Sequence, residues 1–329
     1  YEESQVDDNS NKESDAKDGA AENRNIATVS NEGIVGETGK NTTVTGDVTT
    51  TGETSDGVTA DGSNTKVTVK GNVTVSGTGS AGVSANNNAT VEVTGNVEAK
   101  GDNQTHEGQT GGTYIDKWAD GVEADNGSKV TVDGNVTSQK GWAIDSHGSD
   151  VTVNGDVHSE KGSAINARKG STITIDGSVS SNAGITLGGI IETTESTIKI
   201  TKDVTAKNAW GILAGSEADI EVGGNISSEK EAVYIAGKDA LIVVDGNVYS
   251  TKGCAMDILE QAEATVRGDV SGNKLAIWMD NSSKLQALGK ISSNDVGILL
   301  SLYGDQGTGE LELGTIDAPV SYTHLRAHE

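Results

Sequence analysis

The fold of this chain is decided by two consecutive stretches that nearly repeat each other. Residues 130–149 read VTVDGNVTSQKGWAIDSHGS, and residues 151–171 read VTVNGDVHSEKGSAINARKGS. In both, valine alternates with polar residues, a Gly-Asn or Gly-Asp pair follows, and alanine precedes isoleucine. Alternation with a period of two is typical of a β-strand that buries one face. An immediate near-copy of this kind is the signature of a repeat architecture.

The same unit recurs along most of the chain. Each copy has an anchor position that is glycine everywhere except at Lys202, and most anchors are 21 to 25 residues apart. One interval is longer, the 39 residues from Gly95 to Gly134. Two residues after the anchor, every copy has valine or isoleucine: Val48, Val73, Val97, Val136, Val157, Val179, Val204, Ile226, Val248, Val270, Ile291 and Ile316.

One such unit cannot fold alone. Its four or five aliphatic side chains gain about 1.5–3 kcal/mol each on burial, whereas ordering each residue costs ~1–2 kcal/mol in backbone entropy. Neighbouring units must therefore stack and share a core. The sequence predicts an all-β fold, a single-stranded parallel β-helix (solenoid) of about 12 coils of ~22 residues. Coils ~4.8 Å apart would make a rod about 55 Å long.

The Gly-Asn or Gly-Asp pair of each unit is predicted to form a corner between two strands. Glycine tolerates positive φ, and Asn or Asp tolerates the left-handed region while hydrogen-bonding locally. In stacked coils these side chains are expected to form a structural ladder from Asp47, Asn72, Asn96, Asn135, Asp156, Asp203, Asn225, Asn247 and Asp269.

Composition and charge exclude several classes of protein. The net charge is −25 and the pI is near 4.4, so the chain repels nucleic-acid phosphates and anionic lipid headgroups. We therefore expect no nucleic-acid partner. Cys254 is the only cysteine, which excludes a disulfide framework and a thiolate zinc site. No run reaches the ~20 apolar residues of a transmembrane helix, so no transmembrane segment is expected in this chain.

Three regions differ in character. Residues 1–30 are acidic and nearly free of aliphatic side chains, which predicts a disordered leader. Residues 31–316 carry the repeat, with a loop insertion at 101–120. Residues 317–329 abandon the repeat and resemble an artefactual translated adapter, so we give them no function. Because the chain begins at Tyr1 without Met, we expect it to be part of a longer surface protein.

Over roughly residues 41–316 the coil pattern resembles the right-handed parallel β-helix proteins of the pectin-lyase-like superfamily. Within that superfamily it resembles the adhesin and autotransporter-passenger-like repeats of bacterial surface proteins. The resemblance implies a right-handed helix and an extracellular, cell-surface location. The Gly-His-Gly and Arg-Ile-Lys stretches of the superfamily's hydrolases are absent, and neither Arg168 nor Arg267 lies in a lyase signature. We therefore expect no enzyme and assign no catalytic residue.

The insertion at 101–120 is where recognition residues are expected, because long loops on a rigid scaffold carry function. It contains Tyr114 and Trp118, and Trp142 lies on the following coil. Glu123 and Asp145 occupy the same position of consecutive units and would stack ~4.8 Å apart. Two carboxylates beside aromatic rings are typical of a sugar-binding patch or a weak Ca²⁺ site. A catalytic pair and an ordinary solvated face remain alternatives, and no resident metal or cofactor is expected.

Towards the end of the repeat, outward positions become apolar in two columns. Such a stripe is not left bare on a soluble monomer. We expect it to be covered by a cap, by residues 300–320 or by a further domain, or to bind a partner. Its members are Leu213, Tyr234, Trp278 and Leu299 in one column and Leu275 and Val296 in the other.

Three functions follow from these observations. The first is an adhesin-like stalk or passenger that displays loops for binding host or environmental glycans or a cell-surface receptor. The second is a carbohydrate-active enzyme, a lyase or glycoside hydrolase, that uses Glu123 and Asp145. The third is a structural spacer without a ligand.

Overall fold

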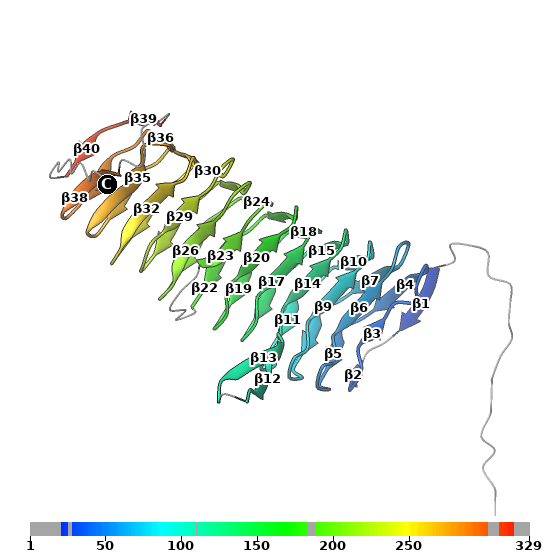
Figure 1. Cartoon of the computed structure of the whole chain (residues 1–329). Helices are drawn as coiled ribbons and strands as arrows, with labels where there is room; N and C mark the ends of the chain where they lie inside the picture. Colours follow the sequence, from blue (N-terminus) through cyan, green and yellow to red (C-terminus); the bar gives the residue numbers. More distant parts are fainter. Residues whose placement is uncertain (1–20, 26–27, 110, 183–188, 302–308, 319–329) are drawn as a thin grey trace, which may run out of the picture.

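The rod predicted from the repeat is present in the computed structural model (Figure 1). The structure describes residues 21–25, 28–109, 111–182, 189–301 and 309–318. Within these residues the fold is an all-β parallel solenoid of about 12 turns of ~22 residues, with three parallel sheets and no helix. The same part of the chain therefore contains no helix long enough and apolar enough to cross a membrane.

Each complete coil contributes one strand to each of three sheets, which we name A, B and C. Sheet A consists of β1 (Ala21–Asn25), β4 (Asn41–Thr45), β7 (Lys66–Lys70), β10 (Thr90–Val93), β15 (Lys129–Val132), β18 (Asp150–Val153), β21 (Thr172–Ile175), β24 (Thr197–Ile200), β27 (Asp219–Val222), β30 (Leu241–Val244), β33 (Glu263–Val266), β36 (Lys284–Ala287) and β39 (Glu310–Leu313).

Sheet B lies beyond the Gly-Asn corner. It consists of β2 (Thr28–Ser30), β5 (Val48–Thr50), β8 (Val73–Val75), β11 (Val97–Ala99), β16 (Val136–Ser138), β19 (Val157–Ser159), β22 (Val179–Ser181), β25 (Val204–Ala206), β28 (Ile226–Ser228), β31 (Val248–Ser250), β34 (Val270–Gly272), β37 (Ile291–Ser293) and β40 (Ile316–Asp317).

Sheet C closes each coil. It consists of β3 (Ile34–Val35), β6 (Val58–Asp61), β9 (Val83–Asn86), β14 (Val122–Asp125), β17 (Ile144–His147), β20 (Ile165–Arg168), β23 (Gly189–Thr193), β26 (Trp210–Ala214), β29 (Val233–Ala236), β32 (Cys254–Leu259), β35 (Leu275–Asp280) and β38 (Val296–Ser301).

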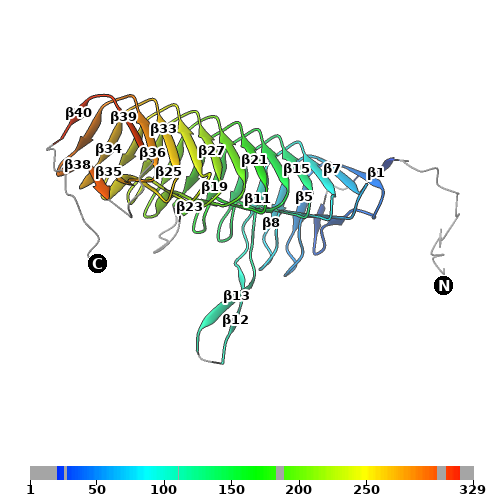
Figure 2. The same cartoon turned by 45° about the horizontal axis from the view of Figure 1, so that its top comes forward.

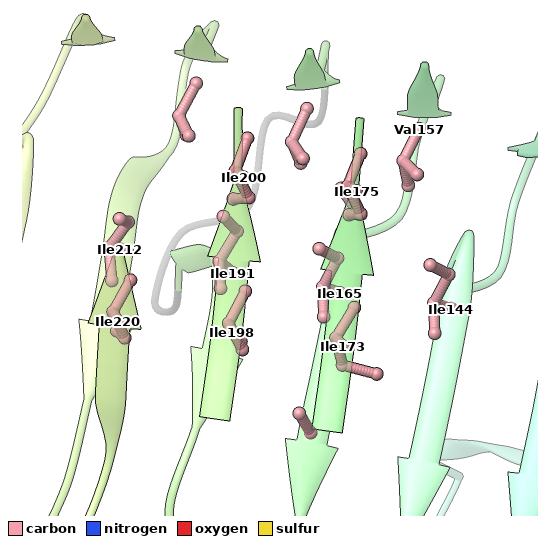
Figure 3. Close-up of a cluster of buried hydrophobic side chains, with 14 of the residues drawn as sticks. Ile144, Val157, Ile165, Ile173, Ile175, Ile191, Ile198, Ile200, Ile212 and Ile220 are labelled. Atoms are coloured by element: carbon pink, nitrogen blue, oxygen red, sulfur yellow. The ribbon is translucent and has the colours of Figure 1, made fainter. Parts of the chain in front are cut away.

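The core is a set of aliphatic columns that run along the rod. In sheet C, Ile144 pairs with Ile165, which pairs with Ile191, and all three are fully buried. Figure 3 shows them beside the isoleucines of sheet A, such as Ile173 and Ile198. The predicted alternation is therefore confirmed, because the same sequence positions point inward in successive coils. One side chain per coil is enough to continue each column.

The corner ladder is confirmed. In it, the side-chain oxygen of one corner residue accepts the backbone N–H of the corner residue in the next coil. The N–H of Asn72 donates to Asp47 Oδ1 at 2.7 Å, and the N–H of Asn96 donates to Asn72 Oδ1 at 2.8 Å. The same contact links Asn225 to Asn247 at 2.8 Å. Each side chain thus satisfies an amide of the next coil that the strands leave free.

The expected reason for the anchor glycines was wrong for most of them. All the anchor glycines are described, and only Gly46 has a positive φ, of 114°. The others are glycine because the coils approach closely: a Cβ on Gly71 would lie 2.4 Å from the carbonyl oxygen of Gly46. The corner residues likewise do not need the left-handed region, since Asn72 is not among the residues with positive φ.

The ends of the repeat and the insertion differ from expectation in detail. Strands β1 and β2 lie inside residues 1–30, so regular strands begin earlier than the predicted leader boundary; residues 1–20 lie outside the described part. Of the tail at 317–329, only residues 317–318 are described. The insertion is not an irregular loop: β12 (Gln104–Glu107) and β13 (Thr113–Lys117) form an antiparallel hairpin. Figure 2 shows this hairpin projecting from the rod.

Candidate functional site

The outer face of sheet C carries the two predicted carboxylates, Glu123 and Asp145, in a single column. Successive strands pair in parallel register, so one outward side chain per coil lies next to its equivalent in the next coil. Along the rod the column changes from polar to largely apolar. Its members, which we call the C column, are Ser84, Glu123, Asp145, Asn166, Glu192, Leu213, Tyr234, Asp257, Trp278 and Leu299.

The hairpin brings an aromatic pair to the polar end of this column. Trp118 follows β13, and its ring centroid lies 6.5 Å from that of Trp142, with the planes tilted by 60°. Two contacts attach the hairpin base to the rod. Lys117 Nζ lies 2.9 Å from Asp56 Oδ1, and Asn103 Nδ2 donates to the Lys140 carbonyl at 3.4 Å. Trp118 remains 40% exposed, so the pair offers an accessible aromatic surface.

Tyr114 lies on the hairpin itself and has a different ring partner. Its ring stacks on His106 with centroids 5.6 Å apart. His106 Nδ1 in turn lies 2.6 Å from Asp116 Oδ1. Tyr114 is 52% exposed, so it belongs to the projecting surface of the hairpin, whereas Trp118 and Trp142 are in ring contact with each other.

The two predicted carboxylates are neighbours, as their sequence positions imply. Glu123 and Asp145 are directly paired in register on β14 and β17. Burial raises the pKa of Glu123, and the carboxylates of Asp125 and Asp56 raise it further. Burial also raises the pKa of Asp145, while His147 and a hydrogen bond from Asn166 act in the opposite direction. Both groups therefore hold protons more tightly than exposed carboxyls do.

A third carboxyl, Asp120, belongs to this site and was not predicted. It is buried, and its Oδ1 accepts the Trp142 N–H at 2.7 Å. Burial, reinforced by Asp145, holds the pKa of Asp120 well above its ordinary value, although the Trp142 N–H lowers it. The sequence feature that could have indicated Asp120 is its place directly before Gly121, the small residue that precedes the sheet C strand of the unit. Asp56 has the same position and likewise accepts an amide, that of Ala81 at 2.8 Å.

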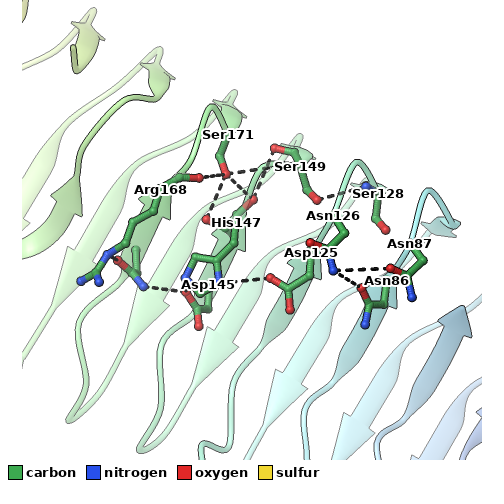
Figure 4. Close-up of polar contacts among 12 residues, drawn as sticks. Asn86, Asn87, Asp125, Asn126, Ser128, Asp145, His147, Ser149, Arg168 and Ser171 are labelled. Carbon is green, nitrogen blue, oxygen red and sulfur yellow. Dashed lines mark hydrogen bonds and ion pairs between the residues drawn. The ribbon is translucent and has the colours of Figure 1, made fainter. Parts of the chain in front are cut away.

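Two basic side chains, His147 and Arg168, complete a polar network that sequence reasoning missed (Figure 4). His147 Nδ1 lies 3.1 Å from Asp125 Oδ1, and its Nε2 lies 3.3 Å from Asp145 Oδ1. Asn166 Nδ2 donates to Asp145 Oδ1 at 2.7 Å, and Arg168 Nε donates to Asn166 Oδ1 at 3.0 Å. The available signal was spacing: His147 and Arg168 follow C-column residues by two positions and so share their face.

The network does not form a metal centre. No group of three or more His, Cys, Asp or Glu side chains in the described residues is placed to hold a metal ion. The weak Ca²⁺ site at Glu123 and Asp145 therefore gains no support from the geometry. The arrangement offers aromatic surface, hydrogen-bond acceptors and a few donors, which suits a ligand that carries hydroxyl groups.

The predicted apolar stripe is present further along the column and is half-buried. Trp210 stacks on Tyr234 with ring centroids 5.7 Å apart, and Trp278 Nε1 donates to Ser301 Oγ at 2.7 Å. Residues 300–320 were one of the expected covers, beside a cap, a further domain and a partner. Their described strands, β39 and β40, instead extend sheets A and B; residues 302–308 and 319–320 lie outside the described part.

The stripe also contains a buried acid that was not predicted. Asp257 lies between Tyr234 and Trp278 in the C column and is 7% exposed, and its Oδ1 has no hydrogen-bond partner. Burial raises the pKa of Asp257 to about 6. Burial also raises the pKa of the neighbouring Cys254 thiol, which donates to the Met256 carbonyl.

No protein-family model, curated protein or solved structure matches this chain. The functional conclusion therefore depends on the fold and on the geometry of the C column.

Proposed function

We propose that this protein is an adhesin-like rod of a bacterial cell surface that binds glycans through the outer face of sheet C. In this proposal the solenoid is the stalk or passenger, and the β12–β13 hairpin with the adjoining C column is the binding region. The proposal includes an extracellular location and membership of the pectin-lyase-like superfamily, both of which rest on the resemblance of the coil pattern.

The observation that carries the proposal is the accessible Trp118–Trp142 pair beside Glu123 and Asp145. Aromatic rings stack on the apolar faces of sugar rings, and nearby carboxylates accept hydrogen bonds from hydroxyl groups. The two tryptophans come from segments 24 residues apart, and the hairpin base is attached to the rod by Lys117, which pairs with Asp56, and by Asn103, which donates to the Lys140 carbonyl. The surface is therefore held in place before a ligand arrives, which lowers the entropic cost of binding.

A glycan-array screen of the whole chain tests the proposal. Wild type is expected to bind a defined set of glycans, and Trp118→Ala and Trp142→Ala are each expected to weaken that binding about tenfold. Tyr249→Ala is the matched control, because Tyr249 is 42% exposed but lies on sheet B. Absence of binding to any glycan, or equal loss in the Tyr249 variant, would contradict the proposal.

A second candidate is a carbohydrate-active enzyme, which the raised pKa values of Glu123 and Asp145 favour. A carboxyl whose pKa is raised can act as a general acid beside an ionised partner. This candidate predicts that the chain shortens a polysaccharide and that Asp145→Asn abolishes the activity while the fold is kept. Binding without any chain shortening would leave the adhesin-like function. A structural spacer, the third possibility, predicts neither binding nor turnover.

A further inference from the structure

A hollow lies on the same face, next to the polar network, with which it shares Arg168. It is a pocket of about 330 Å³ between strands β20, β23, β26 and β29. Small side chains make room for it: Gly215, Ala214 and Ala236 are part of the lining. A Cβ on Gly215 would lie 2.6 Å from Thr194 Cγ2, so a larger residue at 215 would crowd the wall. We call this hollow the Arg168 pocket.

One wall of the Arg168 pocket is polar and carries a donor beside an acceptor. Arg168 Nη2 and Glu192 Oε2 are 3.9 Å apart, which is longer than a hydrogen bond. The guanidinium is oriented through Nε, which donates to Asn166 Oδ1 at 3.0 Å. Its terminal N–H groups and the Glu192 carboxylate can therefore each bind a ligand atom, and neither must first break a short mutual contact.

The opposite wall is apolar and rigid. Leu213 and Tyr234 line it, and the Tyr234 ring is backed by Trp210 in a stacked contact with an interplanar angle of 29°. A stacked ring has little freedom to move, so it presents a flat apolar surface at small entropic cost. The pocket thus combines a platform on one side with a donor and an acceptor on the other.

A neutral pyranose matches these walls. The C–H face of a sugar ring stacks on an aromatic platform, and adjacent hydroxyl groups can accept from a guanidinium and donate to a carboxylate at the same time. A uronic acid fits less well, because its carboxylate would lie close to Glu192, which already lies 3.9 Å from Arg168, the one cation among the described lining residues, on a chain whose net charge is −25. The chemistry of the lining therefore discriminates between two classes of sugar.

We infer that the Arg168 pocket is a saccharide subsite that takes one neutral pyranose unit, with Tyr234 beneath the ring and with Arg168 and Glu192 bracketing two adjacent hydroxyl groups. The inference rests on the proposed glycan binding and extends it in two ways. It adds a site that does not include Trp118 or Trp142, and it names neutral sugars, not polyuronates, as the ligand class.

NMR titration of the full chain tests the inference, because the two sites have separate reporters. The probes are maltohexaose, cellohexaose and mannohexaose as neutral ligands and trigalacturonate as the acidic comparison. Backbone amides of Thr194 and Gly215 report on the Arg168 pocket, and the indole N–H groups of Trp118 and Trp142 report on the hairpin site. At least one neutral hexaose is expected to shift the pocket amides, and trigalacturonate is expected to leave them unchanged.

Variants with matched controls assign the contacts. We expect the affinity measured from the pocket amides to fall about tenfold or more in each of three variants: Tyr234→Leu, Arg168→Gln and Glu192→Gln. The controls place the same changes elsewhere on the rod: Tyr249→Leu on sheet B, Arg267→Gln beside Asp245, and Glu221→Gln beside Lys199. These controls are expected to bind as wild type does, and a thermal melt of each variant confirms that the rod is intact.

The outcomes separate the two proposals. Shifts at the two indoles without shifts at Thr194 and Gly215 would overturn the pocket inference and support glycan binding at the hairpin. Shifts at the pocket amides alone would support the subsite and count against the Trp118–Trp142 site. Trigalacturonate binding in the pocket more tightly than every neutral hexaose would overturn the assigned ligand class. No shift at either site with any probe would overturn both.

Discussion

The backbone N–H of Asn135 donates to Asn96 Oδ1 at 2.8 Å, although 39 residues separate the two in the chain. In most coils the equivalent contact spans 21 to 25 residues, as between Asp156 and Asn135. The hairpin inserted between these two coils therefore leaves the corner ladder unbroken. A rod of this kind can carry a projecting element at one coil because the stacking contacts lie at other positions of the unit.

The ladder predicts a measurable stability cost when one acceptor is removed. Asn96→Ala deletes the oxygen that accepts the Asn135 N–H and is expected to lower the free energy of unfolding by about 1 kcal/mol. Asn154→Ala is the control, because the Asn154 side chain makes an exposed contact with Asp133 and is expected to change little. Urea denaturation followed by circular dichroism measures both. Equal midpoints for the two variants would contradict the structural role of the ladder.

Replacing an anchor glycine is expected to destabilise the rod more than removing a ladder acceptor does, because the anchor lies against the backbone of the preceding coil. A Cβ on Gly71 would meet both the Gly46 carbonyl at 2.4 Å and Asp47 Oδ1 at 2.8 Å. Gly71→Ala must push two coils apart, and we expect a loss of about 2 kcal/mol or more in the free energy of unfolding.

Lys202 supplies the matched control for this prediction. It is the one anchor that is not glycine, and the ladder position of the coil before it is Ser178 instead of Asn or Asp. The side-chain oxygen that a Cβ on Gly71 would meet is therefore missing at this coil, which leaves more room for a side chain at position 202. Lys202→Ala is expected to stay within about 0.5 kcal/mol of wild type. A cost as large as that of Gly71→Ala would show that close approach is not the reason for glycine.

The inward and outward positions of one strand predict opposite tolerance to charge. Val153 on β18 is fully buried, whereas its neighbour Thr152 lies on the outer face between Thr131 and Thr174. Val153→Asp leaves an unpaired charge in the core and is expected to unfold the rod locally or to cost at least about 3 kcal/mol. Thr152→Asp is expected to be nearly neutral. Thermal denaturation compares them, and similar melting temperatures would overturn the assignment of the inner face.

Most of the fold could be predicted because one pattern is repeated in every coil. The valine that follows each anchor must face inward if the units stack at all, and the same register places Glu123 beside Asp145. The hairpin could not be predicted in this way. Its β12 segment, residues 104–107, has no apolar alternation, and its strands are stabilised by pairing with each other.

The remaining parts of the candidate site depend on burial, which a repeat pattern does not encode. Asp120 and Asp257 are buried acids whose raised pKa values arise from their surroundings in the folded rod. Asp257 is at an outward position, where exposure would be expected, yet Tyr234 and Trp278 flank it on both sides. The large side chains in the neighbouring coils bury Asp257. The repeat pattern predicts that its side chain points outward, but it does not predict whether the neighbours cover it.

The buried carboxyl of Asp257 predicts a pH dependence of stability. Its pKa in the folded rod is about 6, raised from 3.8 chiefly by burial and further by Glu231, while Cys254 lowers it through a hydrogen bond. A carboxyl with a raised pKa stabilises the fold least where it is ionised. The contribution of the neutral Asp257 carboxyl to the free energy of unfolding is complete below about pH 4. It is lost as the pH rises towards 6, and it does not return at higher pH.

Asp257→Asn removes the ionisation and is expected to raise the free energy of unfolding by up to about 3 kcal/mol at pH 8. Below pH 4 the variant and wild type are expected to be equally stable, because the carboxyl is then neutral in both the folded and the unfolded chain. Melting temperatures measured from pH 3.5 to 8 test this, with Asp219→Asn, an exposed acid on β27, as the control. A constant difference between Asp257→Asn and wild type across that range would show that Asp257 does not titrate in the folded rod, and its effect would then be one of packing.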